Sequence, residues 1–307
     1  MGTMPSLVIV GHIVLDHIRL QNFPYKRTVG GTPTYAGIAA RRLGCRVKVI
    51  TKVGEDFPEE DVLWLARKGI DLSGLKRVKG AQTTSFELTY RNGDRNLRLL
   101  GLCEPIGPQD IPKALRADGI HLGPVAQEIP TDTFRLLSDL SPCLSLDPQG
   151  YLRSFEEDGF VREALCIDSE LLKPVKILKA SRGEASLLTG LKDPYKACLA
   201  LRSMGPKIVI VTGGAKETII LGEDRKAYMV PSWPSKVVDP TGAGDAFIGA
   251  FLAEYLKGRE APWCACIGAS MASFVVEGYG PAMFGSKAEV YERAERLWEG
   301  LKKVEAS

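Results

Sequence analysis

The chain has 307 residues, 45% of them hydrophobic and 25% charged, which is typical of a folded globular protein and excludes a disordered one. Its 40 basic and 37 acidic side chains leave a formal net charge of +3 without a basic run, which argues against a nucleic-acid partner. No apolar stretch approaches the ~20 residues of a membrane span and no export signal precedes the first apolar run, so we expect a cytoplasmic protein with no membrane partner.

Short β-branched runs alternate with stretches of helical periodicity. Strands are predicted at residues 7–10, 47–51, 120–122, 143–147, 177–180, 208–212 and 218–221. Helices are predicted at residues 32–43, 60–68, 132–140, 195–204, 245–257, 262–277 and 287–303. Strands that are apolar on both faces and separated by helices form mostly parallel sheets with helices on both sides. The pattern therefore predicts one doubly wound α/β domain over residues 1–307.

Two segments interrupt this alternation. Residues 83–100 alternate in polarity around Asn92-Gly93, and this dipeptide is the strongest short-range signal for a β-hairpin. Residues 16–29 read as two extended pieces. Antiparallel ribbons inserted into a parallel domain are often covers or interfaces, so we expect both segments to form a small lid over a site. The alternative is that the two segments only decorate the edge of the domain. The edges of the lid are also a candidate contact between the two subunits of a homodimer.

The sequence lacks the signatures of several other enzyme classes. It contains no P-loop, no complete dinucleotide fingerprint, no His-Glu-x-x-His motif and no Gly-x-Ser-x-Gly motif. The seven cysteines are scattered apart from Cys264 and Cys266, and the three histidines form no ligand cluster. We therefore expect the cysteines to be small buried hydrophobic residues rather than metal ligands.

The most informative stretch is a glycine turn before a predicted helix. Gly242-Ala243-Gly244 follows Pro240 and leads into the helical stretch at Asp245. Backbone N–H groups at a helix start lack partners within the helix and lie at the positive end of its dipole, so the turn predicts an anion site, typically for a phosphoryl group. We expect the dipole to keep Asp245 ionised, so that it can accept a proton from a hydroxyl. An acid that only favours the helix start is the alternative.

This stretch resembles the C-terminal signature of the ribokinase-like (PfkB-type) carbohydrate kinases, Asp-x-x-Gly-Ala-Gly-Asp followed by a small residue and Phe. Asp239, residues 241–245 and Phe247 match it. The resemblance implies a kinase that uses ATP and Mg²⁺, with a monovalent cation as a further candidate cofactor. It assigns the anion hole to Gly242, Ala243 and Gly244, and the catalytic base to Asp245.

Motifs in the N-terminal part extend the resemblance. Asp16 follows Gly11 by five residues, and the resemblance implies that Asp16 binds a substrate hydroxyl. We expect it beyond the end of a parallel strand, where open α/β sheets place ligands, with a solvated loop acid as the alternative. Gly31 precedes Thr32, the predicted N-cap, and Pro33, the predicted first helical residue. Gly31 and Thr32 are therefore expected at the substrate.

Motifs in the C-terminal part resemble the nucleotide site of the family. The residues implied there are Ser181, Thr212, Gly214, Thr241, Ala269 and Ser273. The magnesium-linked Asn-x-x-Glu motif of the family becomes Ser181-Arg182-Gly183-Glu184, so Glu184 is expected to handle Mg²⁺ through water. The sequence also departs from the family at Tyr35, where ribokinase-type sugar kinases carry a sugar-binding asparagine.

Three features of the sequence narrow the choice of the acceptor, the molecule that receives the phosphoryl group. Residues 147–153 resemble the Asp-x-Gln-x-x-x-Arg segment of myo-inositol kinases, which also carry an aromatic residue at the place of Tyr35 and a segment like 179–185. Gln149 can donate and accept and Arg153 donates a planar fork, which suits a ring of hydroxyls. We expect a myo-inositol kinase. The alternatives are a surface loop at 149–153, a ribose or fructose kinase, a non-catalytic ligand sensor on the same fold, or a nucleoside kinase with Phe86 or Tyr90 as base platform.

Overall fold

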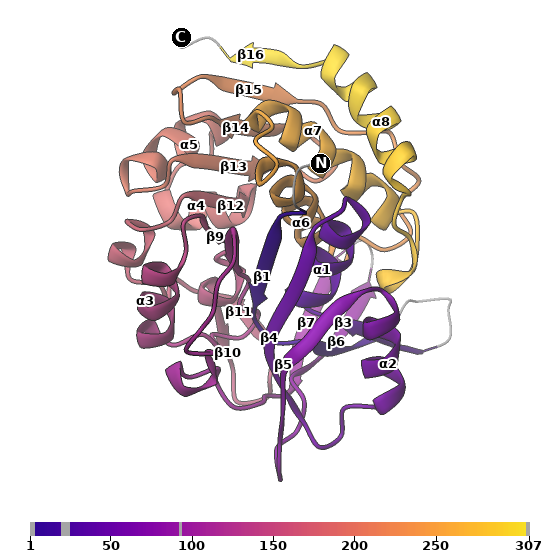
Figure 1. Cartoon of the computed structure of the whole chain (residues 1–307). Helices are drawn as coiled ribbons and strands as arrows, with labels where there is room; N and C mark the ends of the chain where they lie inside the picture. The colour runs from indigo at the N-terminus through magenta and orange to yellow at the C-terminus, as the bar shows by residue number, and fades with distance from the viewer. Residues whose placement is uncertain (1–3, 20–24, 92–93, 305–307) are drawn as a thin grey trace.

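A computed structural model describes the protein over residues 4–19, 25–91 and 94–304. These residues form an α/β fold around a ten-stranded sheet of order β16-β15-β14-β13-β12-β9-β8-β1-β4-β5 (Figure 1). Its strands are β1 (Ser6–Val10), β4 (Arg46–Gly54), β5 (Ile70–Val78), β8 (Gly119–Leu122), β9 (Leu144–Leu146), β12 (Ile177–Ser181), β13 (Ile208–Thr212), β14 (Thr218–Leu221), β15 (Ala227–Val230) and β16 (Lys302–Val304). The strands from β5 to β13 pair in parallel, and β14, β15 and β16 add an antiparallel edge.

Helices cover both faces of this large sheet, which explains its continuous apolar runs. In β1, Leu7 and Ile9 join one core cluster, whereas Val8 and Val10 join the other. The first face is covered by α1 (Thr32–Arg42), α2 (Glu59–Arg67), α6 (Ala243–Tyr255), α7 (Ala261–Val275) and α8 (Lys287–Glu299). The opposite face is covered by α3 (Thr131–Leu140), α4 (Arg182–Thr189) and α5 (Pro194–Ser203). Within the described ranges, no helix has the length and apolarity needed to cross a bilayer.

A second, four-stranded sheet has the order β3-β2-β6-β7 and is called the small sheet below. Its strands are β2 (Val14–Arg19), β3 (Lys26–Gly30), β6 (Ser85–Arg91) and β7 (Asp94–Gly101). The two segments that interrupt the α/β alternation therefore pair with each other, through β2 and β6. The hairpin predicted at 83–100 is present as β6 and β7, although its turn at Asn92-Gly93 lies outside the described residues. A short ribbon of β10 (Arg153–Phe155) and β11 (Val161–Glu163) lies beside β7.

The strands and helices predicted from the sequence are present, with small shifts at their ends. The helix predicted at 287–303 is too long, because α8 ends at Glu299 and β16 follows. The sequence reading missed α4, although Ser181 and Glu184 form a capping box there, a recognised helix-start pattern. It also missed β5, an edge strand with exposed polar residues, because such strands lack a continuous apolar run. Six cysteines are buried as expected, whereas Cys166 is exposed.

The predicted cap of α1 is corrected by the structure. The N-cap is Gly31, and Thr32 is already the first helical residue. Gly31 has φ +84°, and a Cβ atom built on it would lie 2.3 Å from the carbonyl oxygen of His12. Only glycine therefore fits this tight entry to α1 without strain. The hydroxyl of Thr32 is consequently not used as a cap and points to α6 instead, where it donates to Asp245.

Helices α1 and α6 pack against each other at a glycine. A Cβ atom on Gly249 of α6 would lie 2.3 Å from the carbonyl oxygen of Ala36 in α1. Because that neighbour is backbone, it cannot move aside as a flexible side chain would. The close approach fixes the distance between the two helices and so the relative position of Thr32 and Asp245.

We expect Gly249→Ala to lower the free energy of unfolding by about 1–3 kcal/mol, the usual cost of overpacking. Chemical denaturation of purified protein measures this change. Gly183→Ala is the matched control, since its Cβ would lie 3.8 Å from the nearest neighbour atom, Oε1 of Glu163, in an open helix turn. Equal losses in both variants would contradict the packing argument.

Candidate active site

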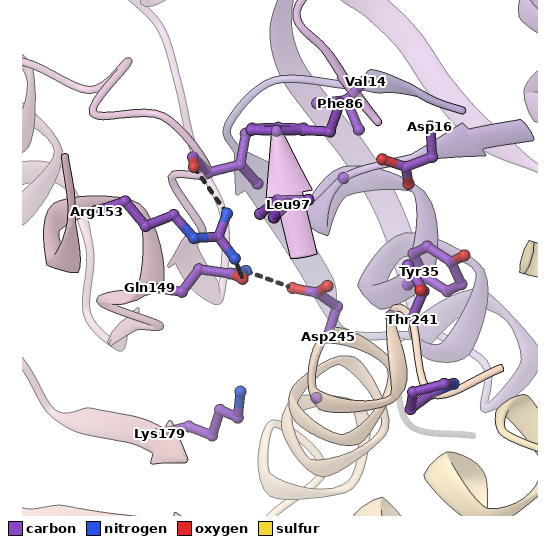
Figure 2. A pocket seen from close by; sticks show the side chains of 15 residues that line it. Val14, Asp16, Tyr35, Phe86, Leu97, Gln149, Arg153, Lys179, Thr241 and Asp245 are labelled. Carbon is purple, nitrogen blue, oxygen red and sulfur yellow. Dashed lines mark hydrogen bonds between the residues drawn. The ribbon is translucent and has the colours of Figure 1, made fainter. Parts of the chain in front are cut away.

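Two pockets adjoin the N-terminal end of α6. The smaller one, here called the acceptor pocket, has a volume of about 150 Å³ and lies between the small sheet and the start of α6 (Figure 2). The larger one, here called the donor pocket, has a volume of about 780 Å³. Gly244 lines both, so the glycine turn separates the two spaces.

The small sheet forms one wall of the acceptor pocket. Val14, Phe86 and Leu97 give this wall an apolar surface, and Asp16 adds a carboxylate. Asp16 lies six residues beyond the end of β1, within β2, and it is buried, so the alternative of a solvated loop acid is wrong. A Cβ atom on Gly30, in the neighbouring β3, would lie 1.9 Å from Oδ2 of Asp16, so this glycine leaves the space that the carboxylate fills.

The opposite wall comes from the short 3₁₀ turn Gln149–Leu152 and the residue that follows it. Nη1 of Arg153 donates to the carbonyl oxygen of Val125 at 2.9 Å, and Nη2 donates to Oε1 of Gln149 at 3.1 Å. These bonds hold the guanidinium in the pocket, 5.9 Å from the centre of the Phe86 ring. The sequence alternative of a surface loop at 149–153 is therefore wrong.

The carboxylate of Asp245 lies at the centre of this arrangement. Its Oδ1 accepts a hydrogen bond from Nε2 of Gln149 at 3.2 Å (Figure 2). It accepts another from the hydroxyl of Thr32 at 2.6 Å. Burial and then the nearby carboxylate of Asp147 raise the pKa of Asp245, Lys179 opposes both, and the resulting pKa is about 6. The sequence predicts that the helix dipole favours the ionised form of Asp245, whereas burial and Asp147 act in the opposite direction.

The glycine turn has fewer open amides, meaning backbone N–H groups that donate to no carbonyl, than predicted. Gly242 is the N-cap of α6 at φ +76°, and a Cβ atom there would lie 2.3 Å from the ring of Tyr35. The amide of Ala243 closes a turn onto the carbonyl oxygen of Pro240 at 3.3 Å. Among the described residues, the amides of Gly242 and Gly244 donate to no backbone carbonyl. These two amides remain available to an anion.

The donor pocket gathers most of the predicted nucleotide residues from β12, β13 and α7. Those that line it are Ser181, Thr212, Gly214, Ala269 and Ser273. Thr241 is the exception, since it lines the acceptor pocket and its amide donates to Oδ1 of Asp239 at 3.0 Å. Gly31 and Gln149 also line the acceptor pocket, as predicted for substrate residues.

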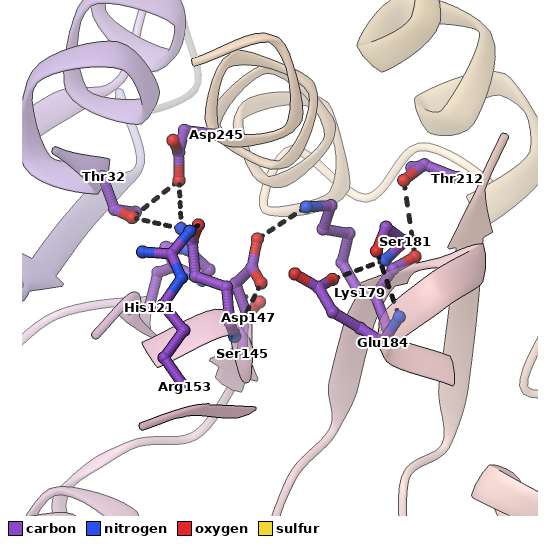
Figure 3. A network of polar contacts seen from close by, with 12 residues as sticks. Thr32, His121, Ser145, Asp147, Arg153, Lys179, Ser181, Glu184, Thr212 and Asp245 are labelled. Carbon is purple, nitrogen blue, oxygen red and sulfur yellow. Dashed lines mark hydrogen bonds and ion pairs between the residues drawn. The ribbon is translucent and has the colours of Figure 1, made fainter. Parts of the chain in front are cut away.

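Glu184 lies in the first turn of α4, beside the donor pocket. Its Oε2 accepts a hydrogen bond from the amide of Ser181 at 2.6 Å, and its own amide donates to the Ser181 hydroxyl at 3.2 Å (Figure 3). The described part of the chain has no group of three or more His, Cys, Asp or Glu side chains that could hold a metal ion. Glu184 is thus a single carboxylate next to the pocket and not a member of such a cluster.

Sequence reasoning missed a buried ion pair behind the glycine turn. Nζ of Lys179 lies 2.6 Å from Oδ2 of Asp147, and both side chains are almost fully buried (Figure 3). From the sequence, Lys179 was named only as part of the segment 179–185 and was assigned no role. A lysine inside an otherwise apolar parallel strand was the available signal, because buried lysines are nearly always paired.

Comparison of the chain with a family model and with related proteins identifies kinases in each case. Residues 4–286 match the model of the pfkB family carbohydrate kinases. The chain is 30% identical over 286 residues to a cytidine kinase from Thermococcus kodakarensis, covering 90% of this chain and 98% of that one. It is 28% identical over 289 residues to an inositol 3-kinase from Arabidopsis thaliana, covering 91% and 76%.

A solved structure is similar as well, with a TM-score of 0.79 and 26% identity over 94% of this chain and 98% of that chain. It is a pyrophosphate-dependent myo-inositol-1 kinase that was converted into a myo-inositol-3 kinase by exchange of one asparagine and one serine for leucine. These similarities confirm the predicted ribokinase-like fold and a phosphotransferase activity. The relatives differ in their acceptors, which include inositol and cytidine by name.

We expect kcat/KM to fall tenfold per pH unit below about pH 6 and to level off above it, because the Asp245 carboxylate must be unprotonated to accept a proton. Initial rates of phosphorylation between pH 4.5 and 8 measure this. Thr32→Val removes a hydrogen bond that lowers the pKa of Asp245, so its acid limb should move to higher pH. A flat profile down to pH 5 would contradict the assignment.

Proposed function

This chain belongs to the pfkB family of carbohydrate kinases, and we propose that it phosphorylates a hydroxyl group of a small polyol, with myo-inositol as the acceptor. The observation that carries this proposal is the acceptor pocket of about 150 Å³, with Asp16, Gln149 and Arg153 around Asp245. Ligand pockets for larger molecules commonly reach ~300 Å³ or more, so this space suits a single ring of hydroxyls.

In the proposed reaction, Asp245 takes the proton of the attacking hydroxyl. Its raised pKa lies close to neutral pH, which suits a general base. The amides of Gly242 and Gly244 face the charge that builds on the transferring group. Phosphoryl transfer needs mainly alignment and charge stabilisation from the protein, and these groups supply both.

We propose ATP with Mg²⁺ as the donor. The donor pocket of about 780 Å³ has apolar walls from Trp233, Val237 and Ala272, and such walls suit a nucleobase. Pyrophosphate has no base and would need only the polar end of this pocket. Magnesium would neutralise charge on the donor phosphates. Glu184, an oxygen ligand next to the pocket-lining Ser181, is the residue placed to hold its water shell.

The small sheet acts as a lid in this proposal. Its apolar wall of Val14, Phe86 and Leu97 faces the polar floor of the acceptor pocket and keeps water away from the phosphoryl group. We propose the 3-hydroxyl of myo-inositol as the attacking group, the position for which a related solved kinase becomes specific once two of its residues are exchanged for leucine. The Arabidopsis thaliana relative is named for the same position.

A nucleoside is the second candidate acceptor, favoured by the similarity to a cytidine kinase. Phe86 lines the acceptor pocket and is an available platform for a base, while the side chain of Tyr90 lies outside the described residues. The Arg153 guanidinium 5.9 Å from the Phe86 ring and the small cavity argue against this acceptor.

We expect Asp245→Asn to lower kcat by about 10²–10⁴, the usual contribution of a general base, with the Kd for ADP nearly unchanged. Steady-state rates and calorimetric titration measure the two quantities. Asp132→Asn is the matched control, since Asp132 is an exposed acid in the first turn of α3. A kcat within threefold of the original enzyme would remove Asp245 as the base.

An ADP-release assay with myo-inositol, ribose, fructose and cytidine, and a parallel assay with pyrophosphate, identifies acceptor and donor. We expect myo-inositol and ATP to give the highest kcat/KM, with a product that chiral chromatography identifies as the 3-phosphate and not its enantiomer, the 1-phosphate. Arg153→Lys should raise the KM for myo-inositol about tenfold or more, because lysine lacks the planar fork. A preference for cytidine would establish the alternative.

A further inference from the structure

Lys179 lies where the acceptor and donor pockets meet. Of the described residues that line the two pockets, only Lys179, Pro240 and Gly244 line both. Lys179 is the one charged residue among these three, and its side chain is 6% exposed. A group that passes from donor to acceptor must therefore pass this ammonium.

The ammonium also lies against the glycine turn. A Cβ atom built on Gly244 would lie 2.6 Å from Nζ of Lys179. Glycine at 244 thus leaves the space that the ammonium fills beside the turn. Two other cations that line these pockets are committed elsewhere, since Arg153 binds Gln149 and Val125, and Arg182 pairs with Glu217. Lys216 lines the donor pocket but not the acceptor pocket.

Three carboxylates act electrostatically on the ammonium, those of Asp147, Glu184 and Asp245, and Asp147 is in direct contact with it. Burial alone would lower the pKa of Lys179, but these three acids outweigh it and raise the pKa. The side chain is therefore a permanent cation. The direct ion pair to the fully buried Asp147 holds it in one orientation, so the charge is fixed in space before any substrate binds.

We propose that Lys179 is a further catalytic residue, whose ammonium contacts the transferring phosphoryl group while Asp147 positions it. This inference rests on the proposed function for its donor and its base. The acceptor oxygen forms a bond to the γ-phosphorus as the bond from that phosphorus to the bridging oxygen breaks. The hydroxyl proton passes to Asp245, ADP leaves with the bonding electron pair, and Lys179 stays protonated throughout.

The competing explanation is that the pair of Lys179 and Asp147 only stabilises the fold. Lys179→Met alone does not separate the two, because it leaves Asp147 buried and unpaired, which is strongly destabilising. The double variant Lys179→Met/Asp147→Asn removes both charges together. It also removes one group that lowers and one that raises the pKa of Asp245, so the acid limb of the pH profile should stay near pH 6.

We expect the double variant to melt within a few degrees of the original enzyme while its kcat, measured above pH 7, falls about 10²–10³-fold. Thermal denaturation and initial rates measure these quantities. A stable double variant with a kcat loss below tenfold overturns the proposal. The rates use whichever acceptor the original enzyme phosphorylates, so rejection of myo-inositol in favour of cytidine overturns the acceptor assignment alone.

A binding measurement needs no acceptor. Calorimetric titration with ADP and with a non-hydrolysable β,γ-imido analogue of ATP gives the preference for the triphosphate. The double variant should lose this preference several-fold on the triphosphate side while its Kd for ADP stays constant. Should no acceptor give turnover, an unchanged preference in the stable double variant overturns the proposal.

Discussion

The site depends on the burial of one carboxylate at the start of α6. A buried charge must be hydrogen-bonded or paired, and Asp245 meets this requirement with Thr32 from α1, Gln149 from the turn after β9, and the charge of Lys179 in β12. Three elements distant in sequence must therefore converge on one helix end. The glycine contact between α1 and α6 makes that convergence possible, because it fixes how far apart the two helices lie.

Much of the fold follows from local pattern. Parallel strands buried on both faces, such as β1, give apolar runs that a single sequence reveals, and Asn92-Gly93 marks the hairpin of the small sheet. The edge strand β5 escapes prediction because its exposed side carries Asp71 and Lys76. Helix α4 escapes because Ser181 and Glu184 read equally well as a ligand motif and as a helix start.

The residues of the site also divide into those whose place follows from local sequence and those whose place does not. Residues within one turn of chain, such as Gly242 and Gly244, were located correctly because their geometry is local. The position of Asp16 in the small sheet and the pairing of Lys179 with Asp147 depend on contacts between residues more than 30 positions apart or on strand register, which spacing does not encode. The raised pKa of Asp245 is a further example, since it arises from packing around the carboxylate.

The division of the acceptor pocket between two sheets has a chemical consequence. In the proposed complex, Asp16 on the small sheet and Gln149 beside the large one would hold opposite sides of the same molecule. The acceptor would then connect the two sheets, and its hydrogen bonds to both would stabilise the closed site during the reaction. A water molecule lacks the several hydroxyl groups with which a polyol can bind both sides at once. A molecule of solvent that reaches Asp245 gains no such closure, which is how the fold can discriminate against hydrolysis of its donor.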